Sequence, residues 1–222
     1  MFQTFSANHV FFLGQAALWT LMLSSLAFLG GTVGGLLLTL LRTAPSVPLN
    51  LLARGYITAI QGTPLLVQLF LAYFGAAALG LQVPPLMAAA IAFTLYASAF
   101  LGEIWRGALQ SIAKGQWECA YALGLDWPKT MLLIIVPQAV RSAVPPTVGF
   151  LVQLVKNTAL ASIIGYTELT RAGQIVSNAT FQPLPVFMTV AVFYFSLCFP
   201  LSLASRALEA RLLGRRPVPL ID

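Results

Sequence analysis

The chain predicts an all-α integral membrane protein with five transmembrane helices and a polar loop between the third and the fourth. Hydrophobic residues make up 59% of its 222 residues, charged residues only 8%, and the mean hydropathy is +0.86. Soluble domains carry roughly 25% charged residues, so this chain belongs in a bilayer. Its apolar residues fall into runs near the roughly 20 that a helix needs to cross a membrane. The length suits one membrane domain, residues 1–222, without a separate soluble catalytic domain.

The first span is predicted at residues 11–41, which is longer than a crossing requires, so we expect its ends to tilt or to lie at the interface. Residues 1–41 contain no Lys or Arg, and we therefore expect the segment to be retained rather than cleaved as a signal peptide. Four glycines at small-xxx-small spacing predict that another helix packs closely here. They are Gly30, Gly31, Gly34 and Gly35.

The second span is predicted at residues 56–79, after a loop between Arg42 and Arg54 that contains two prolines. Within this span, Thr63 is expected to cap a helix that begins at Pro64. A helix N-terminus inside a membrane span can hold a carboxylate, which makes Gly62, Thr63 and Pro64 candidate ligand groups. The alternative is a structural kink, because about 25 Å of helix follows and the break then lies nearer the membrane rim than the midplane.

The third span is predicted at residues 86–109 and ends in a charged pair, Glu103 and Arg106. Their i,i+3 spacing predicts an ion pair at the membrane edge. The alternative is a functional role for Glu103, since ionisable residues inside spans are functional candidates by default.

The fourth span is predicted at residues 147–164, after a helix break at Pro145 and Pro146. Lys156, Asn157 and Thr158 lie in its middle, where an ammonium group is costly without a partner, so we expect Lys156 to face another helix or a watery path. An outer segment with Glu168 follows, and the fifth span is predicted at residues 185–203.

The polar loop, residues 115–141, predicts two short helices joined at a bend. Trp117 and Tyr121 share one face of the first helix at i,i+4. Gly124 supplies the turn, Asp126 can cap the second helix, and its apolar continuation leads back to lipid until Pro137 breaks or kinks it.

Spacing in this loop carries a resemblance. The pattern reads Glu118-Cys119-Ala120, three residues, Gly124, nine residues, Ile134, one residue and Val136-Pro137. It is similar to the coupling motif of permease subunits in ABC importers. Cys119 and Val136 depart from the usual Ala and Leu. The resemblance implies that the loop is cytoplasmic and docks on a separate ATP-hydrolysing subunit. The implied contact residues are Trp117, Glu118, Cys119, Ala120, Tyr121 and Gly124. The alternative is an interfacial amphipathic helix that Glu118 starts.

Further motifs resemble the polar amino acid permeases of the histidine/glutamine type. They are GTPLLVQLFLAYFG at 62–75, EIWRG at 103–107, VKNTAL at 155–160 and TFQP at 180–183. Gln61 and Asn157 stand where many members have Arg and Asp, so a charge pair between them does not carry over. Leu65 replaces an acidic residue that members handling cationic amino acids often carry, which disfavours Arg or Lys as substrate unless a paired subunit supplies the acid.

The resemblance implies a type I ABC importer permease fold and several partners. These are a dimer of ATPase subunits, a second permease subunit that is identical or homologous, a periplasmic or surface substrate-binding protein, and a polar amino acid. ATP and Mg are expected in the ATPase, and this chain is expected to bind no cofactor and to hold no catalytic group. By position, the candidate polar contacts of the substrate path are Gly62, Thr63, Pro64, Glu103, Asn157, Thr158 and Glu168.

Basic residues predict the topology. Apart from Arg171, and Lys156 inside the fourth span, every Lys and Arg falls on one side of the five predicted spans. The preference of Lys and Arg for the cytoplasm predicts that the N-terminus lies outside the cell and that the C-terminus is cytoplasmic. The resemblance implies that the membrane is a bacterial inner membrane. The net charge of +6 therefore reflects topology rather than nucleic-acid binding. Two isolated cysteines with no histidine nearby indicate neither a disulfide framework nor a metal site.

Two other function classes compete with the importer. An ion-coupled secondary carrier or channel would need no ATPase, but the chain lacks the half-to-half repeat of broken spans that many carriers have. An intramembrane enzyme would need catalytic motifs, and neither His-Glu-x-x-His nor Gly-x-Ser-x-Gly occurs.

Overall fold

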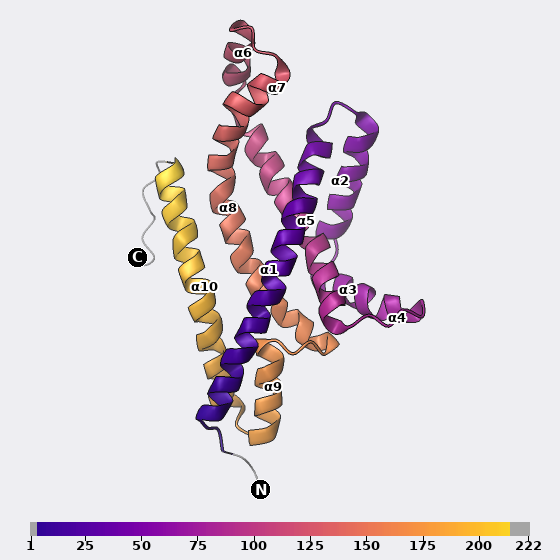
Figure 1. Ribbon diagram of the computed structural model, residues 1–222, viewed down its shortest axis with the longest axis vertical. Coiled ribbons are helices and arrows are strands. Elements are labelled where there is room, and N and C mark those ends of the chain that lie inside the picture. The colour runs from indigo at the N-terminus through magenta and orange to yellow at the C-terminus, as the bar shows by residue number, and fades with distance from the viewer. Residues whose placement is uncertain (1–3, 214–222) are drawn as a thin grey trace.

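A computed structural model of the chain describes residues 4–213 as an elongated bundle of helices (Figure 1). Four helices in this range are long and apolar enough to cross a membrane: α1 (Ala7–Thr43), α5 (Pro85–Gln110), the helix run 127–164 that includes α8 (Val136–Asn157), and α10 (Pro183–Leu213). A bent helix pair gives a fifth crossing if it counts as one span. The predicted all-α membrane fold is confirmed.

The glycines of α1 let it lie directly on α5. A Cβ atom added at Gly31 would lie 2.4 Å from the Cβ of Ala97, and one at Gly35 would lie 2.9 Å from the Cβ of Leu101. Real Cβ atoms never approach so closely, and the contact between the two helices is the most extensive in the bundle. The predicted packing role of the glycine spacing is therefore confirmed.

The second crossing starts earlier than predicted. The expected loop between Arg42 and Arg54 shrinks to Ala44–Ser46, because α2 begins at Val47 and includes Pro48 in its first turn, where a missing N–H costs little. The side chains of Arg42 and Asn50 bond across this corner, and the Asn50 amide also donates to the Arg42 carbonyl over 2.7 Å. A short, cross-bonded turn therefore joins α1 to α2.

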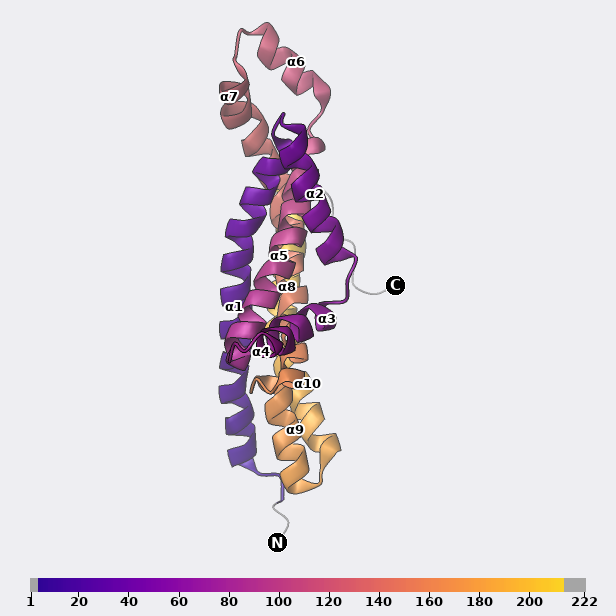
Figure 2. The ribbon, with the colours of Figure 1, turned by 90° about the vertical axis from the view of Figure 1, so that its right-hand side faces the viewer.

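The predicted break in this crossing is confirmed, although its cap is not. Helix α2 (Val47–Gln61) is followed by α3 (Leu65–Phe70), a π-helical turn (Leu71–Gly75) and α4 (Ala76–Ala78), and the chain bends by 100° at the break. Figure 2 shows α3 and α4 lying across the bundle rather than along it.

Thr63 does not cap α3. Pro64 holds the N-cap position, and the Thr63 hydroxyl donates back to the Ala59 carbonyl of α2 over 2.9 Å. Because a hydroxyl committed to the preceding helix is not free to cap the next one, the prediction was wrong in detail. The Gln68 amide spans the bend instead, donating to the carbonyls of Ile60 (2.7 Å) and Thr63 (3.1 Å).

The predicted break at Pro145 and Pro146 was also wrong. Both prolines lie inside α8, and the apolar helical run extends from Trp127 to Ile164 instead of starting at residue 147. Neighbouring hydroxyls bond the backbone around the prolines: Ser205 donates to the Pro145 carbonyl over 2.9 Å and Thr147 to the Ala143 carbonyl over 2.7 Å. Such hydroxyl bonds allow proline within membrane helices.

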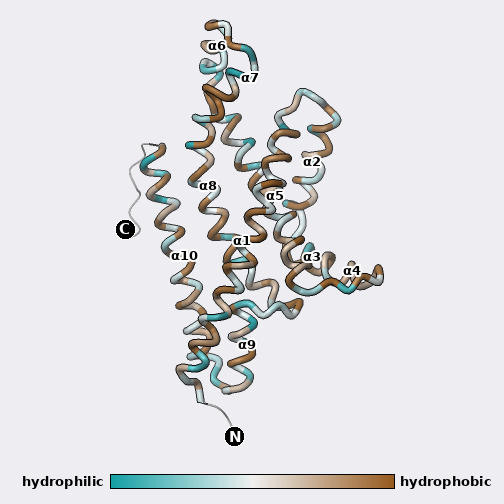
Figure 3. The backbone as a smooth tube through the Cα atoms, in the orientation of Figure 1, coloured by the Kyte–Doolittle hydropathy of each residue, from teal (hydrophilic) through white to brown (hydrophobic). Residues whose placement is uncertain are grey.

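At the end of the bundle opposite α6 and α7, α9 (Leu169–Thr180) packs between the starts of α1 and α10 (Figure 1). A 3-10 helix, Thr158–Ile164, links α8 to it. The start of α1 and the described end of α10 lie toward opposite ends of the bundle, so α1 and α10 run parallel to each other (Figures 1 and 2). Figure 3 shows apolar residues along the long helices and more polar ones at the two ends.

Candidate functional site

The predicted loop forms a bent helix pair that projects beyond every other described helix (Figures 1 and 2). Helix α6 (Lys114–Ala122) ends in a full Schellman turn around Gly124: the Leu125 N–H donates to the Ala120 carbonyl (3.1 Å) and the Gly124 N–H to the Tyr121 carbonyl (2.9 Å). Gly124 has a φ of +75°, which a residue without a Cβ adopts at no steric cost. The glycine therefore sets the bend between the helices.

After the bend, Asp126 starts α7 (Trp127–Thr130) by accepting the Lys129 N–H over 3.1 Å, as predicted. Lys129 also forms an exposed 3.7 Å ion pair with Asp126. A π-helical turn (Met131–Ile135) then runs directly into α8, so Pro137 falls in the first turn of α8 and does not break the helix. The loop is therefore joined to the fourth span by continuous helix.

Most of the predicted contact residues of the loop are exposed on its surface. Glu118, Cys119 and Gly124 are exposed, and the Tyr121 side chain is 49% exposed. Trp117 is half-buried and Ala120 is fully buried against the rest of the loop. An exposed aromatic residue on a short protruding helix is suited to protein contact, because Tyr and Trp are enriched among residues that dominate binding energy.

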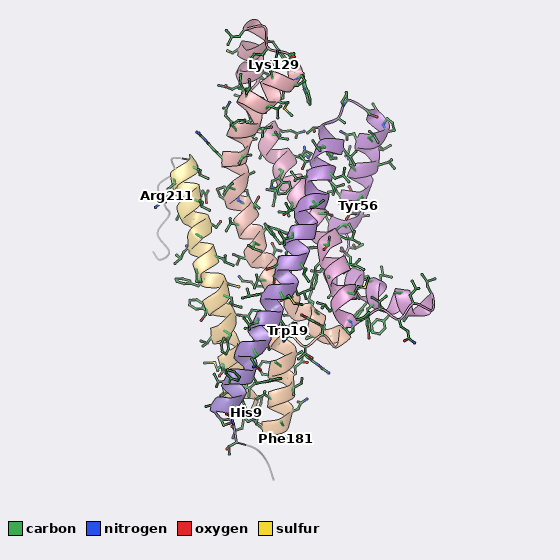
Figure 4. All side chains as sticks on the ribbon, viewed as in Figure 1. His9, Trp19, Tyr56, Lys129, Phe181 and Arg211 are labelled. Atoms are coloured by element: carbon green, nitrogen blue, oxygen red, sulfur yellow. The ribbon has the colours of Figure 1, made fainter. Side chains whose placement is uncertain are left out.

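Basic residues gather at the same end of the bundle. Lys129 marks this end in Figure 4, Arg211 lies on the part of α10 that runs toward it, and His9 and Phe181 mark the opposite end. Arg42 and Lys114 lie where α1 ends and where α6 begins.

A second cluster of polar residues surrounds Glu168 in the connection between the fourth span and α9. The carboxylate is fully buried and accepts hydrogen bonds from the Arg171 N–H (2.9 Å), the Tyr194 hydroxyl (2.8 Å) and, more weakly, the Thr20 hydroxyl (3.4 Å). Burial raises the pKa of Glu168 above its ordinary value, while these bonds oppose the shift. Glu168 thus caps α9 and ties it to α1 and α10.

Thr158 belongs to the edge of this cluster. It is fully buried, its hydroxyl donates to the Val155 carbonyl over 2.7 Å, and it also lies within hydrogen-bonding reach of Tyr194. Thr158 and Glu168 are therefore brought together through Tyr194.

Asn157 and the break in the second span lie on a different part of the bundle. Asn157 is partly exposed and lies within hydrogen-bonding reach of Tyr96 on α5. Leu65, at the start of α3, belongs to the same apolar core as Tyr96. Gly62, Thr63 and Pro64 are exposed beside it. These residues lie on the side of the bundle where α3 packs against α5 and the 3-10 helix Thr158–Ile164.

Glu103 lies apart from both clusters. Its carboxylate forms a two-pronged pair with the Arg106 guanidinium, with Arg106 Nε 2.9 Å from Glu103 Oε2 and a second bond between Arg106 Nη2 and Glu103 Oε1. The predicted i,i+3 ion pair is confirmed.

Sequence reasoning missed the residues that link these elements. Thr20, Tyr96 and Tyr194 are polar residues within apolar runs, and Gln68 is part of a motif without an obvious partner. Their partners lie on other helices or across the bend, so no local pattern announces them. Polar side chains inside predicted spans were the only available signal.

Comparisons with known proteins agree on one family. The family profile described as "Binding-protein-dependent transport system inner membrane component" matches residues 31–214. The "L-cystine transport system permease protein TcyB" of Bacillus subtilis is 37% identical over 195 residues, covering 87% of this chain and 83% of that protein. The "Glutamine transport system permease protein GlnP" of Escherichia coli is 38% identical over 200 residues, covering 89% and 91%.

Solved structures match over nearly the whole chain. The structure titled "Crystal structure of an amino acid ABC transporter with histidines" superposes with a TM-score of 0.89 at 30% identity, covering 94% of this chain and all of that one. The inward-facing "MetNI methionine ABC transporter" superposes with a TM-score of 0.74 at 20% identity, covering 94% and 99%, and shows the shared fold.

Proposed function

Because the chain belongs to the family of binding-protein-dependent transport system inner membrane components, we infer that it forms the transmembrane path of an ABC importer for polar amino acids. The chain is a multi-pass inner membrane protein of a permease family that is not itself catalytic. Its relatives include permeases named for cystine and for glutamine, which supports a polar amino acid as the transported solute. The secondary-carrier alternative has no support among them.

The bent helix pair is the observation that carries this proposal. A protruding, exposed loop joined to α8 by continuous helix is suited to receive force from another protein and to pass it to the bundle. We propose that Trp117, Glu118, Cys119, Ala120, Tyr121 and Gly124 form the ATPase contact, and that the ATPase dimer holds ATP and Mg. ATP-driven closure of that dimer would draw two such loops together and turn the path outward.

The remaining partners are proposed on family grounds. Two permease subunits would line the path, and a periplasmic or surface binding protein would deliver the amino acid from the side of α9. The gathering of basic residues near α6 and α7 supports an orientation with this end in the cytoplasm and the start of α1 outside.

The contact residues are tested by truncating an exposed aromatic side chain. In the reconstituted complex, Tyr121→Ala is expected to lower substrate-stimulated ATP hydrolysis by about tenfold or more, since buried interface tyrosines often dominate binding. Val192→Ala, at an exposed position within α10 and away from both ends of that helix, is the matched control. Equal rates for the two variants would remove α6 from the interface.

We propose that the substrate path uses polar groups from two regions, the cluster around Glu168 and the region of Asn157 and the Gly62–Pro64 break. The partly or fully exposed groups, Gly62, Thr63, Pro64 and Asn157, are proposed to contact the amino acid directly. Thr158 and Glu168 are enclosed, so we propose that they act through Tyr194 and the position of α9. Glu103 is proposed as a charged group of the path that Arg106 partly neutralises.

A substrate screen tests this assignment. Amino acids are compared by their stimulation of ATP hydrolysis in the full complex with its binding protein, and the best one is then used with Asn157→Ala. We expect the variant to need a several-fold higher concentration for half-maximal stimulation, because one hydrogen-bonding group is lost. An unchanged concentration dependence would exclude Asn157 as a contact.

A further inference from the structure

An apolar groove runs between α1 and α8 in the half of the bundle nearest α6 and α7. Its volume is about 590 Å³, its walls include Leu36, Leu40, Val140 and Val144, and Trp105 of α5 lies at its base. The groove exists because α1 packs along α5 and makes far fewer contacts with α8. Leu40 and Val140 are more than half exposed on its two rims.

The groove continues into a second cavity of different chemistry. This cavity of about 280 Å³ shares Thr43, Leu109 and Met131 with the groove and adds Lys114 and two tryptophans, Trp117 and Trp127. Lys114 is exposed, and within residues 4–213 its ammonium group forms neither an ion pair nor a hydrogen bond. One end of a continuous depression is therefore cationic and aromatic, and the rest is apolar.

A depression that is apolar along most of its length and cationic at one end suits an amphiphilic ligand. Apolar openings of this kind do not hold water, so at membrane depth the groove must be filled by hydrocarbon or by protein. Indole rings favour the level of the lipid headgroups, and a free ammonium group there attracts anionic headgroups. We propose that the groove holds an acyl chain of an anionic phospholipid whose headgroup lies against Lys114, Trp117 and Trp127.

The dimensions favour a lipid chain over a transmembrane helix. A helix is about 10–12 Å across with its side chains, so two turns would need more space than the groove offers. A single acyl chain is much thinner, and the volume lies within the roughly 300–1,000 Å³ typical of small-molecule sites.

The position of the lipid gives it a mechanical role. Thr43 ends α1, Leu109 is near the end of α5, and Met131 begins the π-helical turn that leads into α8. A headgroup in contact with α6 would therefore tie the bent helix pair to three spans. The inference depends only on insertion of the bundle in a membrane, and not on the identity of the ATPase or the substrate.

Photolabelling of the full-length chain tests the inference. The chain, purified with its native partners, is placed in nanodiscs that contain phosphatidylglycerol with a diazirine in one acyl chain, and labelled peptides are located by mass spectrometry. Labels are expected in residues 36–43 and 136–148. Lys114→Gln should lower this labelling about fivefold, the effect of one basic residue near an anionic surface. Lys129→Gln is the matched control, since Lys129 is exposed nearby but lines neither cavity.

A groove-filling variant provides a second test. Val140→Trp fills the opening from its exposed rim, so it should abolish labelling of residues 36–43 without disturbing the core. Equal labelling by a phosphatidylcholine analogue, or labelling that Lys114→Gln leaves unchanged, would reduce the groove to a surface wetted by bulk lipid and overturn the proposal. Cross-linking of Val140→Cys to a second permease subunit would assign the groove to protein and overturn it as well.

Discussion

A single buried carboxylate organises the end of the molecule that contains α9. Glu168 lies on no long helix, yet it bonds the first turn of α9 and hydroxyls from α1 and α10. Its hydroxyl partners on α1 and α10 lie 148 and 26 residues away in the sequence. Long-range polar contacts of this kind are what the sequence could not predict, because they exist only once the helices have packed.

Removing one donor should weaken this junction. Tyr194→Phe is expected to lower the free energy of unfolding by on the order of 1 kcal/mol, because the buried Glu168 carboxylate loses a hydrogen-bond donor. The measurement is thermal unfolding of the purified complex in detergent. Ser196→Ala is the control, since that hydroxyl only bonds its own helix at an exposed position. Similar unfolding temperatures for both variants would contradict a structural role for the Glu168 cluster.

Among the elements, the contact of α1 with α5 should be the least tolerant of added volume. Gly31→Ala would place a methyl group 2.4 Å from the Cβ of Ala97, so the helices must move apart, at a cost of about 1–3 kcal/mol. Gly107→Ala on α5 meets no atom within 4 Å and should instead stabilise its helix by about 0.5–1 kcal/mol. Thermal unfolding distinguishes the two signs, and a neutral or stabilising Gly31→Ala would contradict the packing.

The bend between α6 and α7 depends on one backbone conformation. Gly124→Ala puts a Cβ at a φ of +75°, which costs about 1–2 kcal/mol and shifts the loop toward other geometries. We expect ATP hydrolysis stimulated by substrate to fall several-fold while the folded complex is retained. Gly55→Ala on α2, where an added Cβ meets no atom within 4 Å, should leave the rate unchanged. A rate for Gly124→Ala equal to that of Gly55→Ala would show that the bend is not needed for coupling.

At the level of elements, the sequence predicted which segments cross the membrane better than where they end. Apolar runs identify the crossings, because the bilayer fixes their minimum length. The prolines gave wrong helix boundaries, because Pro145 and Pro146 lie within α8 and Pro48 lies inside α2. Whether a proline interrupts a helix depends on hydroxyls and neighbours supplied by other segments, as with Ser205 at Pro145. The bend at Gly62–Pro64 was predictable because glycine and proline act there together.

For the whole molecule, the distribution of basic residues and the shape of the bundle both distinguish one end from the other. The bundle has one end with α9 and one with the bent helix pair, and basic residues gather toward the second (Figure 4). The sequence alone suggested this asymmetry from the positions of Lys and Arg. The packing of α9 against the starts of α1 and α10 could not be foreseen, because α9 is short and not apolar enough to be recognised as a crossing.

The two native cysteines allow the proposed orientation to be measured first on the chain without substitution. Cys119 is exposed on α6 and Cys198 is buried on α10, so a membrane-impermeant maleimide should label only Cys119. We expect labelling in inverted vesicles and none in right-side-out vesicles, because the distribution of Lys and Arg predicts a cytoplasmic α6. Leu184→Cys in a Cys119→Ser background should show the opposite pattern, since residue 184 is exposed at the other end. Bound ATPase should protect Cys119 from the maleimide, because an interface excludes water and reagent from its centre.

Two outcomes would contradict these expectations. Labelling of Cys119 from outside the cell would reverse the proposed orientation and exclude the ATPase contact. Labelling from the cytoplasmic side that bound ATPase leaves unchanged would support the orientation but place the ATPase contact elsewhere on the chain.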